Sequence, residues 1–555
     1  MTVSDRAALL PLALVVSLAM GSLSTAPAAA QEGPIRLFGD LPPSSGGTLP
    51  APSPPSFGPA TVGDSGIVSQ SLGILNADGY GLLDGRAGGL GTDMWAGTSM
   101  ADALALVQAL PIGTPSRAMT ALARRVLLTT ATPPVSANGE TNGALMPARA
   151  DALFKMGLQN DLSDMLARVP DDVITDGLRA RRMEAQFLLS HFEGACDDAA
   201  TGNAKGTNPL FLRAQVFCQV EAGQTDAASL GMDMLRELGQ ADGAFLVLAE
   251  RLGGLSQGKP PPPKPLDALT VTLYRAAKEP FPKGILANAE PWLDRAVALS
   301  GPADPAQRLE GGERAEANGA LPPDALRYMY GDTPFEGAEK ARPLDAVLAD
   351  NTPLSRALAF QIVRDTAAPP QRMEALAKVL EYVRSKAPTL YLTQARVYLP
   401  LLREIPVLDT ALPQAPALAR ALYGAGDGRS GAAWLRLLQT HERDSAEAPA
   451  AIRALWTMDR VANHRVTTDT IPLTETVTQP FTPGPSIPLE RLSLAASRRA
   501  TAETALLALT ALGAAGGPAQ ANWIILDEAT HALDAVGLAD ASATLVLEAL
   551  AIRME

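Results

Sequence analysis

Apolar residues recur every three or four positions through most of the chain, a spacing that predicts amphipathic helices. The clearest example runs from Phe211 to Leu238, where a turn at Ala222-Gly223 separates two such runs and predicts a helical hairpin. The second helix carries an apolar stripe at Ala227, Leu230, Met234 and Leu238. One hairpin cannot bury two such stripes alone, so the pattern predicts neighbours of the same kind.

Further helices are expected on both sides of this hairpin, punctuated by Pro and Gly. They cover residues 101–110, 116–130, 148–157, 162–169, 178–192, 371–385 and 430–439. Three more are expected within residues 489–512 and 519–552. A polar loop is expected from Asp197 to Asn208, between two helices.

Composition divides the chain into seven segments. They are a signal peptide (1–30), a flexible lead-in rich in Pro, Gly and Ser (31–97), a helical block (98–255), a Pro-rich linker (256–265), a second helical block (266–465), a Thr- and Pro-rich loop (466–488) and C-terminal helices (489–555). Within the lead-in, Leu41 to Pro59 has too few apolar residues to fold, and Trp95 is the expected anchor at its end. The expected fold class is therefore all-α, a stack of helical hairpins.

A loose internal repeat of one sequence pattern supports this interpretation. Four segments, near residues 154, 219, 422 and 533, end one helix on a small residue and Gly, turn through polar residues and begin the next helix with Ala or Ser. This turn chemistry resembles that of TPR-like and other α-solenoid repeats in architecture alone, because a strict period and a full family signature are missing. The resemblance implies an irregular α-solenoid. The alternative is that Gly and Asp end most helices and the four segments coincide by chance.

Charge narrows the range of partners. The chain is 47% hydrophobic and 19% charged, with a formal net charge of −13 and a pI of about 5.0. It would be repelled by a phosphate backbone or an anionic membrane surface unless a basic patch intervened, and its Arg pairs are isolated. We therefore expect no nucleic-acid partner.

Residues 1–30 have the pattern of a secretory signal peptide. Arg6 precedes an apolar run from Ala7 to Met20, and small residues ending at Ala30 predict cleavage there. The run is too short for a comfortable membrane span and no later stretch is long enough, so no span is expected in the mature chain. An export signal with high Ala and Arg usage favours a periplasmic or secreted bacterial protein.

The two cysteines, Cys196 and Cys218, are most simply a disulfide in an oxidising compartment. Such a bond would join two consecutive helices and stabilise the chain by roughly 3 kcal/mol. Two buried thiols are the alternative. A metal site is disfavoured because no second Cys pair or nearby His pair completes the ligands.

One segment looks like a protease nucleophile. Gly97 to Ala101 resembles the Ser segment of subtilisin-like serine proteases, and Asp64-Ser65-Gly66 resembles their Asp segment. In that family the base, a His, lies between the Asp and the Ser. The only histidines are His191, His441, His464 and His531. We therefore expect Ser99 to cap a helix together with Asp102.

Two other segments resemble nucleotide-binding motifs. Gly253 to Lys259 fits a P-loop, but Pro260 replaces the Ser or Thr that must hold Mg²⁺. Ile525 to Asp534 resembles the Walker B and D-loop region of ABC ATPases. A P-loop also needs a preceding strand and a following helix, whereas here a helix precedes and a Pro run follows.

The remaining candidates are weaker. The segment from Asn76 resembles a calcium loop, but Ala87 stands where a bidentate Glu belongs. The histidines lack a second ligand three or four residues away, and the acidic pairs Asp171-Asp172 and Asp197-Asp198 fit helix starts or loops. A glycosidase pair assembled from distant positions stays open. No catalytic, cofactor-binding or metal-binding residue is assigned.

These observations favour an exported, non-catalytic helical scaffold or adaptor that binds another cell-envelope protein through a groove between helical blocks. The alternative is a cell-envelope hydrolase that acts on glycan, or its accessory subunit. Helical superstructures accompany lytic transglycosylases, but no segment here resembles their catalytic domain. A solute-binding protein is disfavoured by the aromatic content of 5%.

Overall fold

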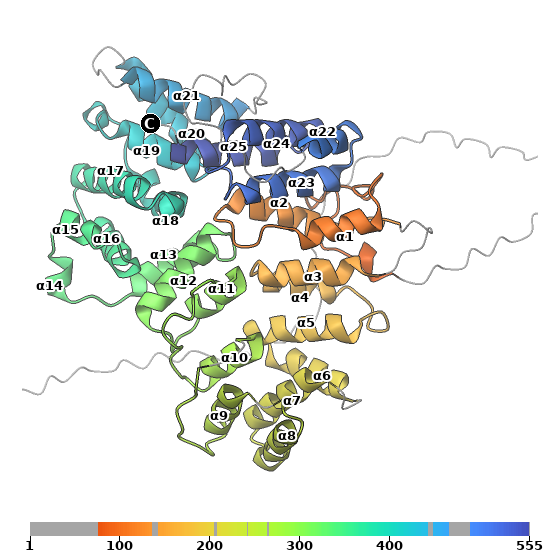
Figure 1. Cartoon of the computed structure of the whole chain (residues 1–555). Coiled ribbons are helices and arrows are strands. Elements are labelled where there is room, and N and C mark those ends of the chain that lie inside the picture. The colour runs from red at the N-terminus through yellow and green to blue at the C-terminus, as the bar shows by residue number, and fades with distance from the viewer. Residues whose placement is uncertain are drawn as a thin grey trace, which may run out of the picture. The chain divides into compact units, whose positions relative to one another are not determined.

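The computed structural model describes residues 76–135, 143–204, 208–240, 242–262, 266–441, 448–464 and 489–553, which all belong to one compact unit spanning residues 71–555. These described residues contain twenty-five α-helices and three short 3-10 helices, with no strand beyond an isolated parallel bridge between Leu83 and Thr129 (Figure 1). The all-α prediction is therefore confirmed. The predicted signal peptide, the lead-in before residue 76 and the segment 466–488 lie outside the described residues.

Residues 76–97 lead irregularly into the first helix and are held by buried contacts. Trp95 is buried, as expected of an anchor. The Asp78 carboxylate accepts a hydrogen bond from the Met146 backbone N–H at 2.6 Å, and the Asp78 carbonyl accepts one from Arg149 at 2.9 Å. Arg149 is fully buried, and burial lowers its pKa to about 10. The calcium-like segment from Asn76 is thus a docking turn.

The first ten helices mostly follow the expected hairpin pattern, except that the first helix packs chiefly on the third and not on the second. They are α1 (Met100–Gln108), α2 (Arg117–Leu128), α3 (Leu145–Lys155), α4 (Gln159–Leu166), α5 (Asp176–Leu188), α6 (Phe192–Asn203), α7 (Pro209–Glu221), α8 (Thr225–Glu237), α9 (Gly243–Leu252) and α10 (Ala268–Ala276). Side-chain caps explain several starts, because oxygens of Ser99, Ser116 and Thr175 accept N–H groups of the first turn. Each helix from α4 to α7 packs on the helix that follows it, and α10 returns to pack on α5.

The predicted disulfide is confirmed, and it joins α6 to α7 with a Cα–Cα distance of 5.8 Å between Cys196 and Cys218. The predicted polar loop from Asp197 is wrong in its first half, since α6 continues to Asn203. Asp198 is buried inside this helix, where Arg179 and Arg182 donate to it at 3.0 Å and 2.6 Å. The sequence hid this because both arginines lie on the previous helix.

Eleven helices form the middle of the chain. They are α11 (Pro291–Ala298), α12 (Pro305–Ala317), α13 (Pro323–Asp332), α14 (Gly337–Lys340), α15 (Leu344–Ala349), α16 (Pro353–Asp365), α17 (Pro369–Lys386), α18 (Tyr391–Glu404), α19 (Ala415–Gly424), α20 (Gly428–Thr440) and α21 (Ala448–His464). Five of them begin with Pro, whose missing N–H costs nothing at that position. A buried ion pair joins α12 to α16, with Arg356 donating to Glu313 at 2.7 Å and 2.6 Å.

Four helices, not the expected three, close the described chain. They are α22 (Leu489–Ser497), α23 (Thr501–Ala514), α24 (Trp523–Ala535) and α25 (Ala539–Arg553). The extra break falls between α22 and α23, where Arg499 has a φ of 56°. A left-handed residue stops the helical ladder, and nothing in the local apolar spacing signals it.

The C-terminal helices return to the start of the chain. Helix α23 packs on α1 and α2, and α25 packs on α2, α18, α19 and α21 (Figure 1). One hydrophobic core contains residues from both ends, such as Leu122 and Leu507. Glu548 of α25 accepts hydrogen bonds from the Ser116 hydroxyl and, at 3.0 Å, from the Ala118 N–H. Helix α25 therefore joins the first helices to the middle of the chain.

The four segments that share the repeated sequence pattern, near residues 154, 219, 422 and 533, are helix–turn–helix hairpins. Each turn has a Gly in the left-handed region, at Gly157, Gly223, Gly426 and Gly537, with φ between 70° and 85°. In each, the Gly N–H and the following N–H bond back to carbonyls at the end of the first helix. The stacked hairpins are compatible with a helical-repeat architecture.

Helix α8 is rotated relative to the prediction. Its stripe of Ala227, Leu230, Met234 and Leu238 faces solvent, and the buried face is instead Ala228, Gly231, Met232 and Leu235. Gly231 decides the rotation, because a Cβ there would lie 2.6 Å from a Val216 methyl of α7. The missing side chain lets the two helices approach closely on that face.

Candidate functional site: a groove between α1 and α3

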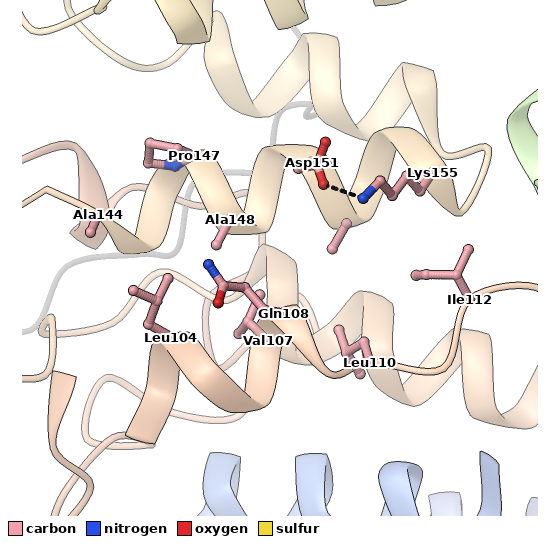
Figure 2. A pocket seen from close by; sticks show the side chains of 11 residues that line it. Leu104, Val107, Gln108, Leu110, Ile112, Ala144, Pro147, Ala148, Asp151 and Lys155 are labelled. Atoms are coloured by element: carbon pink, nitrogen blue, oxygen red, sulfur yellow. Dashed lines mark ion pairs between the residues drawn. The ribbon is translucent and has the colours of Figure 1, made fainter. Parts of the chain in front are cut away.

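An apolar groove of about 630 Å³ lies between α1 and α3 (Figure 2). Its walls are mostly aliphatic: Leu104, Val107, Leu110 and Ile112 on one side, and Ala144, Pro147, Ala148 and Ala152 on the other. Gln108, Asp151 and Lys155 supply its polar groups. Apolar walls with a few placed polar groups are typical of binding sites.

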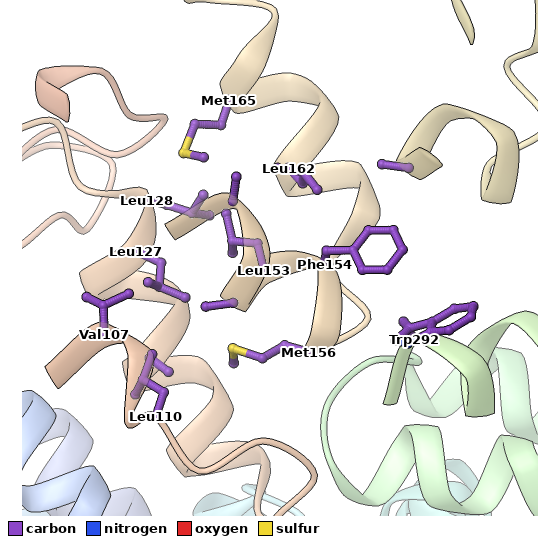
Figure 3. Packing of buried hydrophobic residues seen from close by; sticks show 14 of the residues in the cluster. Val107, Leu110, Leu127, Leu128, Leu153, Phe154, Met156, Leu162, Met165 and Trp292 are labelled. Carbon is purple, nitrogen blue, oxygen red and sulfur yellow. The ribbon is translucent and has the colours of Figure 1, made fainter. Parts of the chain in front are cut away.

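Small residues leave this space open. The side of α3 that faces α1 carries Ala144, Ala148 and Ala152, spaced by four residues, and Figure 2 shows Leu104 and Val107 on the opposite wall. The larger side chains of α3 point to the core behind the groove, where Leu153 and Met156 pack among Leu127, Leu128 and Met165 (Figure 3). The α3 wall is therefore supported by a close-packed core, while its small side chains leave space in the groove.

One end of the groove is charged. Asp151 pairs with Lys155 at 2.8 Å and with Arg181 of α5 at 2.8 Å. Arg181 also donates to Glu184 at 2.9 Å and lies over the Phe154 ring at 4.6 Å from its centroid. The groove thus continues into an ion-pair chain running from α3 to α5.

Glu184 is the most perturbed acid near the groove. Burial raises its pKa to about 7, Asp267 and Asp151 raise it further, and Arg181 and Arg213 oppose the shift. Glu184 does not line the groove, because Arg181 stands between its carboxylate and Asp151. Glu184 therefore affects the groove only indirectly, because Arg181 binds both its carboxylate and that of Asp151, which lines the groove.

The protease-like segment performs a structural task. The Ser99 hydroxyl caps α1 and donates to Asp102 at 2.6 Å, and Asp102 pairs with Arg491 at 2.7 Å. The capping role expected for Ser99 is confirmed. Asp64 lies outside the described residues.

The nucleotide-like segments also form ordinary structure. Gly253 ends α9, and Arg251 binds the carbonyls of Gln257 and Gly258 at 3.0 Å and 3.1 Å. A phosphate-binding loop points backbone N–H groups at the phosphate. Here the loop points carbonyl oxygens at the Arg251 guanidinium instead. The Walker B-like segment lies within α24, the first helix of the last hairpin.

The described parts of the chain hold no cluster of three or more His, Cys, Asp or Glu side chains placed to bind a metal ion. Among the described helices, none combines the length and apolar content that crossing a bilayer requires. His191 precedes α6 and His531 is exposed on α24. No histidine is among the residues that line the groove.

Comparison of the chain with known protein families, with curated proteins and with solved structures finds no match.

The sequence led us to expect a groove between helical blocks, whereas this groove lies within the first block and was not predicted, although one signal for it was present. Ala144, Ala148 and Ala152 recur at helical spacing within a segment otherwise rich in large apolar residues. Such spacing shows that one side of the helix carries only small side chains. Whether a neighbouring side chain fills the space depends on α1, whose placement the local pattern leaves open.

Proposed function

We propose that this protein is an exported, non-catalytic helical scaffold of the bacterial cell envelope, and that it seats a segment of a partner protein in the groove between α1 and α3. The groove is the observation that carries the proposal, because about 630 Å³ of apolar-walled space is large enough for several side chains.

An amphipathic helix is the partner segment that fits best. The groove lies between two helices of nine and eleven residues, about 14 and 16 Å long, and a third helix of similar length can lie along it. Its apolar side chains would contact Leu104, Val107 and Ala148. Gln108 and the Asp151–Lys155 pair at the rim would fix its direction through hydrogen bonds.

Export is supported by two independent features. Residues 1–30 have the signal-peptide pattern described above, and the disulfide between Cys196 and Cys218 belongs to an oxidising compartment. We therefore propose that the mature chain, after cleavage near Ala30, lies in the periplasm or in the secreted fraction.

The groove is tested by filling it. Ala148→Leu adds three carbons inside the groove, whereas Ala105→Leu adds the same three at an exposed position of α1 that does not line it. A photoreactive amino acid at Leu104 is expected to crosslink one defined protein in envelope extract. We expect Ala148→Leu to abolish this crosslink and Ala105→Leu to retain it.

Thermal unfolding of both variants serves as the control for folding, since each leucine enters open space. An unchanged crosslink in Ala148→Leu would contradict the proposal. So would the absence of any specific crosslink in the otherwise unaltered protein.

The alternative, an envelope hydrolase acting on glycan, is favoured by one observation. Glu184 has a pKa of about 7, in the range of a general acid, and Asp151 is a second carboxylate on the same Arg181. Purified protein is expected to release no soluble fragments from peptidoglycan. Release that disappears in Glu184→Gln would support the hydrolase instead.

A further inference from the structure

The outer face of α8 is an exposed apolar stripe. Leu230, Met234 and Leu238 are 64%, 45% and 56% exposed, and Ala227 continues the line at helical spacing. Isolated exposed leucines are common on protein surfaces, but four aligned apolar positions on one helix are not. Folding alone does not require this stripe, because α8 already buries its opposite face on α7.

Helix α8 has no cover on this side among the described helices. Its extensive packing is with α7, and it lies at the end of the series of hairpins that begins at α3 (Figure 1). End repeats of helical stacks ordinarily present a polar outer face, because no further repeat covers them. An apolar outer face at this position is the pattern expected of a docking surface.

The charges beside the stripe indicate what covers it. Helix α8 contains three acidic residues, Asp226, Asp233 and Glu237, and one basic residue, Arg236, for a net charge of −2. Arg236 is already paired with Asp233 at 2.6 Å and with Glu250 at 2.8 Å. At helical spacing all three acidic residues lie on the same side of the stripe, which therefore has one acidic margin.

This acidic margin disfavours two occupants. A second copy of α8 would bring a further net charge of −2 against the first, and an anionic lipid surface would be repelled in the same way. A basic segment would gain from the same charges, and complementary charge favours the correct partner over wrong ones.

We propose that the outer face of α8 binds an amphipathic helix of another protein, one whose apolar stripe is flanked by Lys and Arg. The residues from Ala227 to Leu238 span about three turns, or roughly 17 Å, so the bound helix needs about the same length. This surface is formed by different residues from the groove, and it gives the scaffold a second, independent binding site.

The test uses the full-length disulfide-bonded protein and two synthetic eighteen-residue helical peptides with one identical leucine stripe, flanked by lysines in one peptide and by glutamates in the other. Binding is measured by fluorescence anisotropy. We expect the lysine peptide to bind at least about tenfold more tightly than the glutamate peptide, and more weakly as salt increases.

Leu230→Ser should weaken binding of the lysine peptide about tenfold. The matched control is Leu255→Ser, which removes a leucine of similar exposure, 53%, outside α8. Ala148→Leu in the groove should leave this binding unchanged, so that failure of the groove and failure of this surface are distinguished. Both serine substitutions lie at exposed positions, and circular dichroism checks that the variants remain folded.

Three results would overturn the proposal. One is equal or absent binding of the two peptides. Another is self-association in analytical ultracentrifugation that Leu230→Ser abolishes, which would assign the stripe to a second copy. The last is binding to phosphatidylglycerol vesicles that Leu230→Ser abolishes, which would assign it to a lipid surface.

Discussion

Single residues set the electrostatics around the groove, and Glu184 is the clearest case. Its carboxylate, on α5, is largely buried near charged groups of α3, α7 and the start of α10, and one guanidinium, that of Arg181, binds both Glu184 and Asp151. Burial disfavours the ionised form, and this is why its pKa rises to about 7. Holding that charge costs the folded state free energy at neutral pH.

The stability of the protein should therefore depend on pH through Glu184. Its folded pKa of about 7 lies above the ordinary value of 4.5, so its stabilising contribution is complete below about pH 4.5 and is lost as the pH rises to about 7. We expect the free energy of unfolding of the native protein, relative to that of Glu184→Gln, to fall by up to about 3 kcal/mol over this range. Urea unfolding at pH 4.5 and pH 8 measures it.

Glu193→Gln makes the same amide substitution at an exposed position of α6 and is the control for this measurement. A difference between the native protein and Glu184→Gln that stays constant with pH would show that the carboxyl is not perturbed as described. Sequence reasoning could not single out Glu184, because its environment comes from α3, α7 and α10, far along the chain.

At the scale of elements, short turns could be predicted and helix rotation could not. The turn at Gly223 is encoded locally, since a small residue followed by Gly stops one helix and polar residues begin the next. The rotation of α8 is decided by Gly231 against Val216, a contact between two helices. Both faces of α8 contain apolar residues, so periodicity alone selected the wrong one.

The left-handed turn positions make a paired prediction. Arg499 has a φ of 56°, where glycine is favoured, so Arg499→Gly should raise the free energy of unfolding by up to about 1 kcal/mol. Gly537 has a φ of 81°, and a Cβ there would meet no other atom. Gly537→Ala therefore causes no clash but strains the backbone, and it should lower the free energy of unfolding by about 1 kcal/mol.

Chemical denaturation with both variants checks these signs. Gly85→Ala is the control, because Gly85 lies outside the left-handed region and a Cβ there also meets open space. Equal effects at Gly85 and Gly537 would show that the backbone angle is not the cause.

At the scale of the whole molecule, the chain returns to its own beginning. Helix α25 contributes Glu548 to the first turn of α2, where its carboxylate binds the Ser116 hydroxyl and the Ala118 N–H. Arg117 and Arg396 lie near this carboxylate and oppose the rise in its pKa that burial causes. Local sequence patterns predicted α2 and α25, but they carry no information about contacts across 430 residues.

Glu548→Ala should destabilise the protein by about 2–4 kcal/mol, because it leaves a helix cap and a buried hydroxyl without their acceptor. Urea unfolding measures the loss, and hydrogen exchange should show reduced protection of α2 and α25 together. Glu490→Ala, at an exposed position of α22, should change stability by less than about 0.5 kcal/mol. Loss of protection in α25 alone would argue against coupling of the two ends.

This closure has a consequence for biosynthesis. The apolar side of α2 meets α23 and α25, so this part of the surface of the first helices stays uncovered until the last helices have been made. During nearly the whole of translation, the nascent chain would expose the apolar side of α2 to solvent. A chaperone would have to cover this surface in that interval. A premature stop codon that removes α25 would therefore also destabilise α2, at the opposite end of the chain.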